Sequence, residues 1–200
     1  KKIYKRSTIL KKVIIMVFII LSGITSSYAV FFIDGQYSQA ATGDYDYVSG
    51  GALGLGFSLT DDINFLVKAS IETNTENKGA LDELKYELAR ATGGIEYIPS
   101  FDILDEYRVY WRTSLNLGAA EFESDMPEIK DSDETDIGVH LSFWTGLQFN
   151  FTQNIAPFFD IGYHKTFFTL GDSDLAISGW QMAFGVRFYI GGSRDYNTGF

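Results

Sequence analysis

Apolar and polar residues alternate at a period of two through most of the sequence, and this pattern restricts the fold more than any other feature. Successive side chains of a β-strand point to opposite faces, so a period of two predicts strands rather than helices. Within one block, Phe65 and Val67 share one face, and Asn64 and Lys68 share the other. The pattern predicts eight strands, over 30–40, 48–59, 63–73, 85–97, 107–120, 137–151, 155–169 and 177–190.

The connections between these blocks alternate in length. Short "TDD" and "TQN" segments and a moderate "IPSFDILDE" join the second to the third, the sixth to the seventh and the fourth to the fifth block. The other four connections are longer or more polar. Short connections favour antiparallel neighbours, so the chain should run up and down, with both ends of the strand region on the side of the three tighter turns.

Two arginines interrupt the otherwise apolar stretch "YRVYWRTSLNLG" at 107–118, and they show which face is inside. Arg108 and Arg112 share a face, opposite Val109 and Trp111. Arginine is almost never fully buried without a partner. Across the predicted strands the polar faces combine charges of both signs with glycines and aromatic residues. This mixture is typical of a packed interior with paired charges.

The apolar faces should therefore contact lipid. A sheet crosses a membrane only when it closes, and eight strands leave an interior just wide enough for side chains to fill. The sequence thus predicts an all-β fold, an eight-stranded antiparallel up-and-down transmembrane β-barrel with a polar, side-chain-filled interior. The predicted charge network of the lumen is Asp34, Lys68, Glu72, Arg90, Glu96, Arg108, Arg112, Asp160 and Arg187.

Hairpin register predicts partners for some of these charges. Lys68 should lie opposite Gly54, and Arg108 opposite Glu96. Closure of the last strand on the first should bring Arg187 to Asp34, with Asp160 within reach. On the outer face, aromatic residues near both ends of the strands predict interfacial girdles. The girdle residues are Tyr37, Tyr97, Tyr107, Phe149, Phe167 and Trp180.

The ends of the sequence differ from the alternating region. Residues 1–29 combine a basic head, a nine-residue apolar run at 13–21 and a small-residue site at "SYA", the pattern of a secretory signal peptide. The predicted domains are therefore 1–29 as signal peptide, 30–190 as transmembrane β-barrel and 191–200 as a short periplasmic C-terminal tail.

Charge and composition limit the functional classes. All 26 acidic residues but only 10 of the 16 basic residues follow position 29, so that part has a net charge of −16. Nucleic acid requires a basic surface, so it is not expected as a partner. The chain has no cysteine, which excludes a disulfide framework and a thiol nucleophile. We expect no metal site and no cofactor.

Together, the N-terminal segment, the eight alternating blocks, the long and short connections and the charged polar face resemble the small bacterial outer-membrane barrels of the OmpA/OmpX type. The resemblance covers residues 30–190 and lies in pattern rather than in a sharp motif. It implies a bacterial outer membrane, periplasmic termini and loops on the cell surface. The tail "GGSRDYNTGF" after Ile190 departs from the family, in which a terminal aromatic residue often ends the last strand.

Most of the negative charge lies in the predicted loops. The segment 121–136 holds eight acidic residues and one lysine. It lacks the glycine and final glutamate of an EF-hand, so a solvated loop is the better interpretation. We therefore predict a monomeric, non-enzymatic surface protein that contacts outer-membrane lipids and lipopolysaccharide. It would act as a membrane scaffold or through an extracellular partner at loops 121–136 and 74–84.

Two alternatives from other classes stay open. His140 and Ser142 share the polar face of one strand, and His-x-Ser is similar to the outer-membrane lipid A deacylases, so a lipid-modifying enzyme is one alternative. Asp160 lies too far along the strand from His164 to complete a triad. A secreted, lipocalin-like soluble barrel that binds an apolar ligand is the other. It would place the apolar faces inside.

Overall fold

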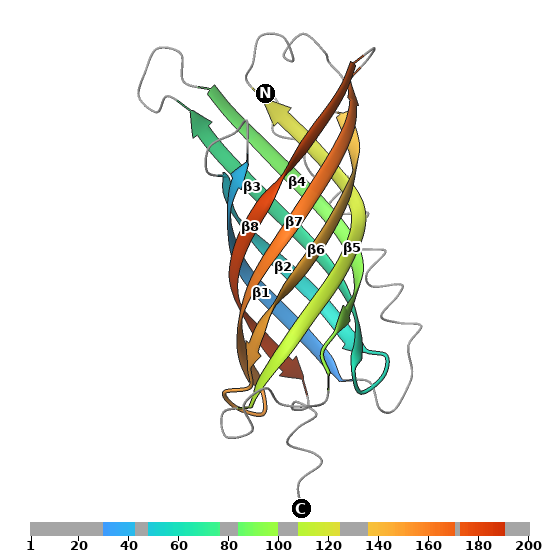
Figure 1. The fold of residues 1–200 in the computed structure, drawn as a ribbon, viewed down its shortest axis with the longest axis vertical. Helices are drawn as coiled ribbons and strands as arrows, with labels where there is room; N and C mark the ends of the chain where they lie inside the picture. The colour runs from blue at the N-terminus through green and yellow to red at the C-terminus, as the bar shows by residue number, and fades with distance from the viewer. Residues whose placement is uncertain are drawn as a thin grey trace, which may run out of the picture.

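The structure is a closed β-barrel of eight strands (Figure 1). It is a computed structural model that describes residues 30–42, 48–76, 84–99, 108–124, 136–170 and 173–190. Within these residues, no helix is long and apolar enough to cross a membrane. The strands are β1 (Phe31–Thr42), β2 (Val48–Ser58), β3 (Ile63–Glu76), β4 (Leu84–Tyr97), β5 (Val109–Ser124), β6 (Asp136–Phe149), β7 (Ile155–Leu170) and β8 (Ser173–Ile190).

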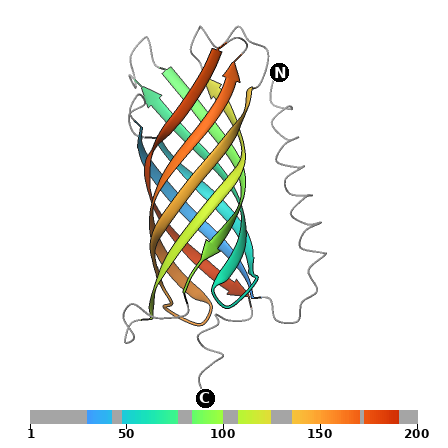
Figure 2. The same ribbon diagram turned by 45° about the vertical axis from the view of Figure 1, so that its right-hand side comes forward.

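Every strand pairs antiparallel with its sequence neighbours, and β8 pairs with β1 to close the barrel. The closing seam runs from Phe31 opposite Ile190 to Thr42 opposite Gly179. The strands wind around the barrel at a marked tilt in both views (Figures 1 and 2). Closure leaves no sheet edge with unpaired backbone groups, which is the condition for a sheet in lipid. The predicted up-and-down barrel is confirmed.

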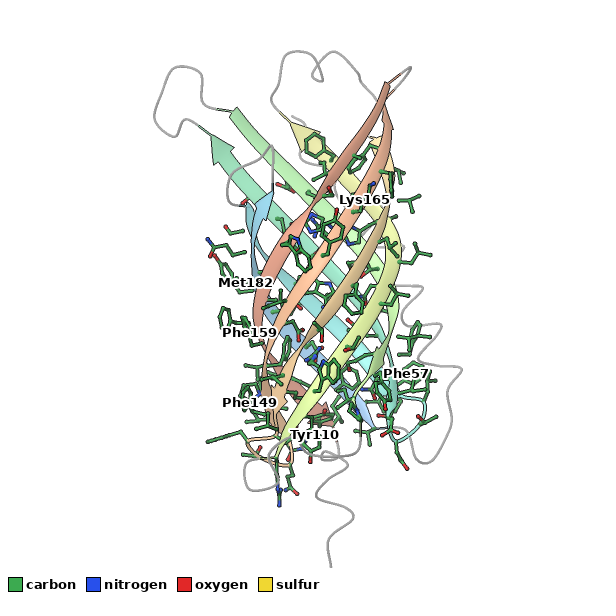
Figure 3. All side chains as sticks on the ribbon, in the orientation of Figure 1. Phe57, Tyr110, Phe149, Phe159, Lys165 and Met182 are labelled. Carbon is green, nitrogen blue, oxygen red and sulfur yellow. The ribbon has the colours of Figure 1, made fainter. Side chains whose placement is uncertain are left out.

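The inside and the outside of the barrel are the reverse of those in a soluble sheet protein. The Trp111 and Phe184 side chains are 50% and 61% exposed, whereas Arg112 and Arg187 are 3% and 0% exposed. Phe149, Phe159 and Met182 lie along the outer wall (Figure 3). The lipocalin-like alternative, with apolar faces inside, is therefore wrong.

The two short turns are built by the same local device. In the β2–β3 turn, the Thr60 hydroxyl accepts hydrogen bonds from the backbone N–H groups of Asp62 and Ile63, at 3.3 and 3.0 Å. In the β6–β7 turn, the Thr152 hydroxyl accepts from Asn154 and Ile155, at 3.2 and 3.0 Å. A threonine that bonds to backbone two and three residues later stabilises a tight turn. The sequences "TDDI" and "TQNI" thus fix two registers locally.

The register predicted for the β4–β5 hairpin is wrong. Glu96 lies opposite Ser114, not opposite Arg108. Arg108 has a positive φ of 50°, so the chain leaves the extended conformation there and β5 begins only at Val109. Val109 itself is 3% exposed at the end of the barrel, and it is not part of the exposed apolar surface. Two other predicted pairs are confirmed, Lys68 with Gly54 and Arg187 with Asp34. The register of β6 and β7 also sets Ser142 opposite His164.

Interior glycines provide space for aromatic rings on adjacent strands. A Cβ added at Gly56 would collide with the Phe32 ring, and one at Gly162 with the Trp144 ring. The interior of an eight-stranded barrel is narrow, so a large ring needs an absent side chain beside it. This explains why the inward faces mix glycines with aromatic residues.

Gly162→Val should destabilise the barrel by about 1–3 kcal/mol, the usual cost of overpacking a filled interior. The added methyl groups would meet the Trp144 ring and the Phe143 carbonyl oxygen. Gly35→Val is the matched control, because a Cβ at the outward-facing Gly35 has no atom within 4 Å. Urea unfolding of the refolded protein in micelles measures the free energy of unfolding of both variants. Equal stability of the two variants would contradict the packing of Trp144 on Gly162.

Candidate functional site

The barrel interior holds two groups of charged side chains, one in each half. The first, the turn-side cluster, lies in the half near the short turns and consists of Asp34, Glu96, Arg112, Asp160 and Arg187. Arg187 forms two parallel hydrogen bonds to Asp34, at 2.7 and 2.8 Å, and two to Glu96, at 2.6 and 3.1 Å. Such paired geometry is the strongest form of arginine–carboxylate contact. Arg187 thus joins β8 to β1 and, across the lumen, to β4.

Arg112 extends the turn-side cluster toward β7. Its Nη2 lies 2.7 Å from a Glu96 oxygen, and its Nε lies 3.4 Å from Asp160 Oδ1. Its guanidinium lies 3.9 Å from the centre of the Phe158 ring, and that of Arg187 lies 3.7 Å from the Phe32 ring. Arginine stacks well on aromatic faces. Ion pairs and rings together fill this half of the interior.

The second group, the loop-side cluster, consists of Ser38, Glu72, Arg90 and Gln181. Both Glu72 oxygens accept hydrogen bonds from Arg90, at 2.8 Å each, and from the Gln181 amide, at 2.8 and 2.9 Å. The Ser38 hydroxyl donates a further bond of 3.3 Å. Glu72 and Gln181 are 109 residues apart in the chain. The carboxylate has no unused lone pair in this arrangement.

The formal charges of the interior balance. Among the described inward-facing residues, four carboxylates (Asp34, Glu72, Glu96 and Asp160) face four cations (Lys68, Arg90, Arg112 and Arg187). Buried charges are costly unless they are paired and hydrogen-bonded. Eight of the nine residues predicted for the lumen network therefore lie in the interior. The ninth, Arg108, lies at the barrel end before β5.

Amide side chains are the interior residues that sequence reasoning missed. Asn64 donates to Glu96 at 2.9 Å, and Lys68 donates to the amide oxygen of Gln36 at 2.8 Å. Gln181 bridges to Glu72 across the lumen. All three occupy inward positions of their strands, and the period-two pattern already sets Asn64 on the polar face with Lys68. The predicted network, however, contained only charged residues.

The histidine and serine candidates lie together inside the barrel. Ser142 is opposite His164 in the β6–β7 register. His140 Nδ1 hydrogen-bonds to the Thr166 hydroxyl at 2.8 Å, and the two imidazole rings are 5.9 Å apart. Gln181 is the polar side chain beside the His164 ring. Among the described residues, no hydrogen bond joins Ser142 to either histidine.

The predicted aromatic girdle residues lie on the outer wall where they are described. Exposed fractions range from 42% to 64% for Phe149, Phe167, Tyr97, Tyr37 and Trp180. Tyr107 lies outside the described residues. Lys165 faces outward toward the loop end, and its Nζ lies 4.7 Å from the Phe167 ring centre (Figure 3). The wall thus has an apolar band with aromatic residues toward both ends, as a membrane requires.

The side chains leave little free space within the barrel. A cavity of about 20 Å³ lies beside the loop-side cluster. A volume of about 10–15 Å³ by this measure holds one water molecule. The described residues contain no group of three or more histidine, aspartate or glutamate side chains arranged to hold a metal ion.

Similar barrels are found among solved structures. Neisserial surface protein A is 16% identical with a TM-score of 0.55, and the match covers 80% of this chain and 96% of that one. The outer membrane protein OprG from Pseudomonas aeruginosa is 12% identical with a TM-score of 0.56, and the match covers 81% and 96%. The protein has the fold of the small outer-membrane barrels. No family model and no curated protein matches the chain by sequence.

This outer-membrane-type barrel should depend on its interior ion pairs. Arg187→Met would leave the buried Asp34 carboxylate without its main partner and would remove one of the two arginines that contact Glu96. The free energy of unfolding should fall by about 3–5 kcal/mol. Lys165→Met on the outer wall is the control and should change it by no more than about 0.5 kcal/mol. Denaturant titration in micelles measures both, and similar effects at the two sites would contradict a buried arginine.

The lipid-facing assignment predicts an asymmetric response to added charge. Leu115 is 57% exposed near the middle of the outward apolar run of β5. Leu115→Arg should destabilise the inserted barrel by about 2–4 kcal/mol, the cost of a cation at mid-membrane depth. Phe151→Arg, at the 78% exposed turn position, should cost about 1 kcal/mol or less. The fraction of each variant that folds into lipid vesicles is measured from its heat-dependent mobility on a gel. Equal insertion of both would contradict the assignment.

Proposed function

We propose that the protein is a closed, non-enzymatic barrel of the bacterial outer membrane that presents acidic loops at the cell surface. The barrel serves as a membrane scaffold, and the loops make the contacts with a surface partner. The observation that carries the proposal is the filled and charge-balanced interior beneath a strongly acidic set of connections.

The interior argues against a pore. Arginine–carboxylate clusters span the lumen in both halves, and Phe32, Trp144 and Phe158 pack against their neighbours. A barrel of eight strands has no room for a water-filled channel beside such side chains. Reconstituted protein should therefore add no steady conductance to a planar lipid bilayer. Stable ion currents from the wild-type protein would contradict a closed scaffold.

The loops hold the charge that the interior does not. The four described interior cations balance the four interior carboxylates. The net negative charge of the chain after position 29 therefore lies mainly in the segments that connect the strands. The segment 121–136 alone has eight acidic residues and one lysine. A concentrated charge of one sign steers association with partners of the opposite sign. We therefore infer a cationic partner surface, or one reached through bridging cations.

An enzyme of the lipid-modifying type has less support. His140 and Ser142 are 2% and 4% exposed, and both face the lumen rather than the lipid. A lipid chain would have to enter a filled barrel to reach them. His140→Ala and Ser142→Ala should therefore leave the lipid composition of the expressing cell unchanged. A change in acylation that either variant abolishes would overturn the non-enzymatic assignment.

Single-cysteine labelling tests the proposed orientation, because the natural chain has no cysteine. Ser132→Cys places the thiol in the acidic 121–136 segment, and Gln153→Cys places it in the exposed β6–β7 turn. A membrane-impermeant maleimide should label the first variant on intact cells, and the second only after the outer membrane is permeabilised. The reverse pattern would invert the orientation, and the loops would then face the periplasm.

A further inference from the structure

The cavity beside the loop-side cluster is lined by charged and hydrogen-bonding side chains. They come from seven strands and include Lys68, Ser70, Glu72, Arg90, Ser142 and Trp144. Lys68 and Arg90 bring two positive charges to the lining, and Glu72 brings one negative charge. The hydroxyl groups of Ser70 and Ser142 can rotate to donate. The lining therefore has a net charge of +1.

The one carboxylate of the lining, Glu72, already accepts hydrogen bonds at both of its oxygens. Both oxygens of Glu72 already accept from Arg90 and Gln181. In contrast, the Nε of Arg90 is buried and has no hydrogen-bond partner. A buried donor without a partner costs free energy and in native proteins usually marks a bound water or ion. This N–H group is therefore free to hold a ligand.

Lys68 is the second cation of the lining. Its ammonium group has three donors, and it bonds to the uncharged Gln36 oxygen at 2.8 Å. None of the described carboxylates lies within 4.0 Å of Lys68 Nζ, so no direct ion pair forms. The surplus carboxylate of the turn-side cluster balances its charge only over a longer distance. A half-buried ammonium without a close counter-ion is an unfavourable arrangement.

We propose that this cavity is a binding site for a monoatomic halide anion of the chloride class. The anion would accept hydrogen bonds from Lys68 Nζ and Arg90 Nε and from the serine hydroxyls. The volume of about 20 Å³ suits one small species and excludes a phosphate or a carboxylate ligand.

A water molecule is the competing occupant. The amide oxygens of Asn116 and Gln181 also border the cavity without hydrogen-bond partners, and water could donate to them. Water would leave the charge of Lys68 without a close counter-ion, whereas a halide supplies one. The two occupants therefore differ in their dependence on added halide and on the charge at position 68.

Trp144 provides a local reporter, since it lines the cavity and its ring centre lies 5.7 Å from Lys68 Nζ. The chain has three tryptophans, and Trp111 and Trp180 face outward. Trp111→Phe with Trp180→Phe leaves Trp144 as the single fluorophore. This protein is refolded into micelles in sodium bromide or in sodium gluconate of equal ionic strength, so that entry of the probe is not limited by the closed barrel. Bromide quenches a tryptophan that it contacts.

Bromide should reduce Trp144 fluorescence to a plateau, and chloride should reverse the effect. Lys68→Met should raise the half-saturating bromide concentration at least about tenfold, the loss expected for one charge-assisted hydrogen bond. Lys165→Met, a matched change on the outer wall, should not alter it. If Lys68→Met fails to fold, Lys68→Gln replaces it. Fluorescence that does not saturate with bromide, or equal saturation in the Lys68 variant, would overturn the proposal and leave water alone in the cavity.

Discussion

The structure depends on one constraint, the need to satisfy every backbone hydrogen bond within a wall that faces hydrocarbon. An open sheet leaves two edges of unpaired N–H and C=O groups, each costly away from water. The pairing of β8 with β1 from Phe31 to Thr42 removes these edges. Once the sheet is closed, the period-two alternation exposes one apolar face of each strand on the outer wall, while rings such as Phe32 and Trp144 pack inside. The polar side chains on the opposite face then point into the lumen.

Because the barrel is closed, the charges inside it must be balanced by opposite charges from other strands. Arginines placed in a narrow lumen cannot reach bulk water, so each requires carboxylates from other strands. Arg187 and Arg112 share Glu96, and Arg90 engages Glu72. Glycines beside Trp144 and Phe32 then make room for the rings that fill the remaining space. The same packing that holds the barrel together also fills its interior.

Charge is distributed differently in the barrel interior and in the segments that connect the strands. The interior is neutral, whereas the connections at the loop side are strongly acidic. Loops tolerate more variation than the paired strands that they connect. Neisserial surface protein A and OprG, at 16% and 12% identity, share the fold of the wall.

The period-two sequence pattern was enough to predict the strands, their approximate bounds and the face of most side chains, because alternation is a local property of consecutive residues, although Val109 is buried at the barrel end. The sequence also determined the registers of the two hairpins whose turns are set by Thr60 and Thr152. It failed at Arg108, where a positive φ delays the start of β5 and shifts the register against Glu96. Only the tertiary structure decided which charges share partners, since Arg187 and Glu96 are 91 residues apart and meet only across a closed lumen.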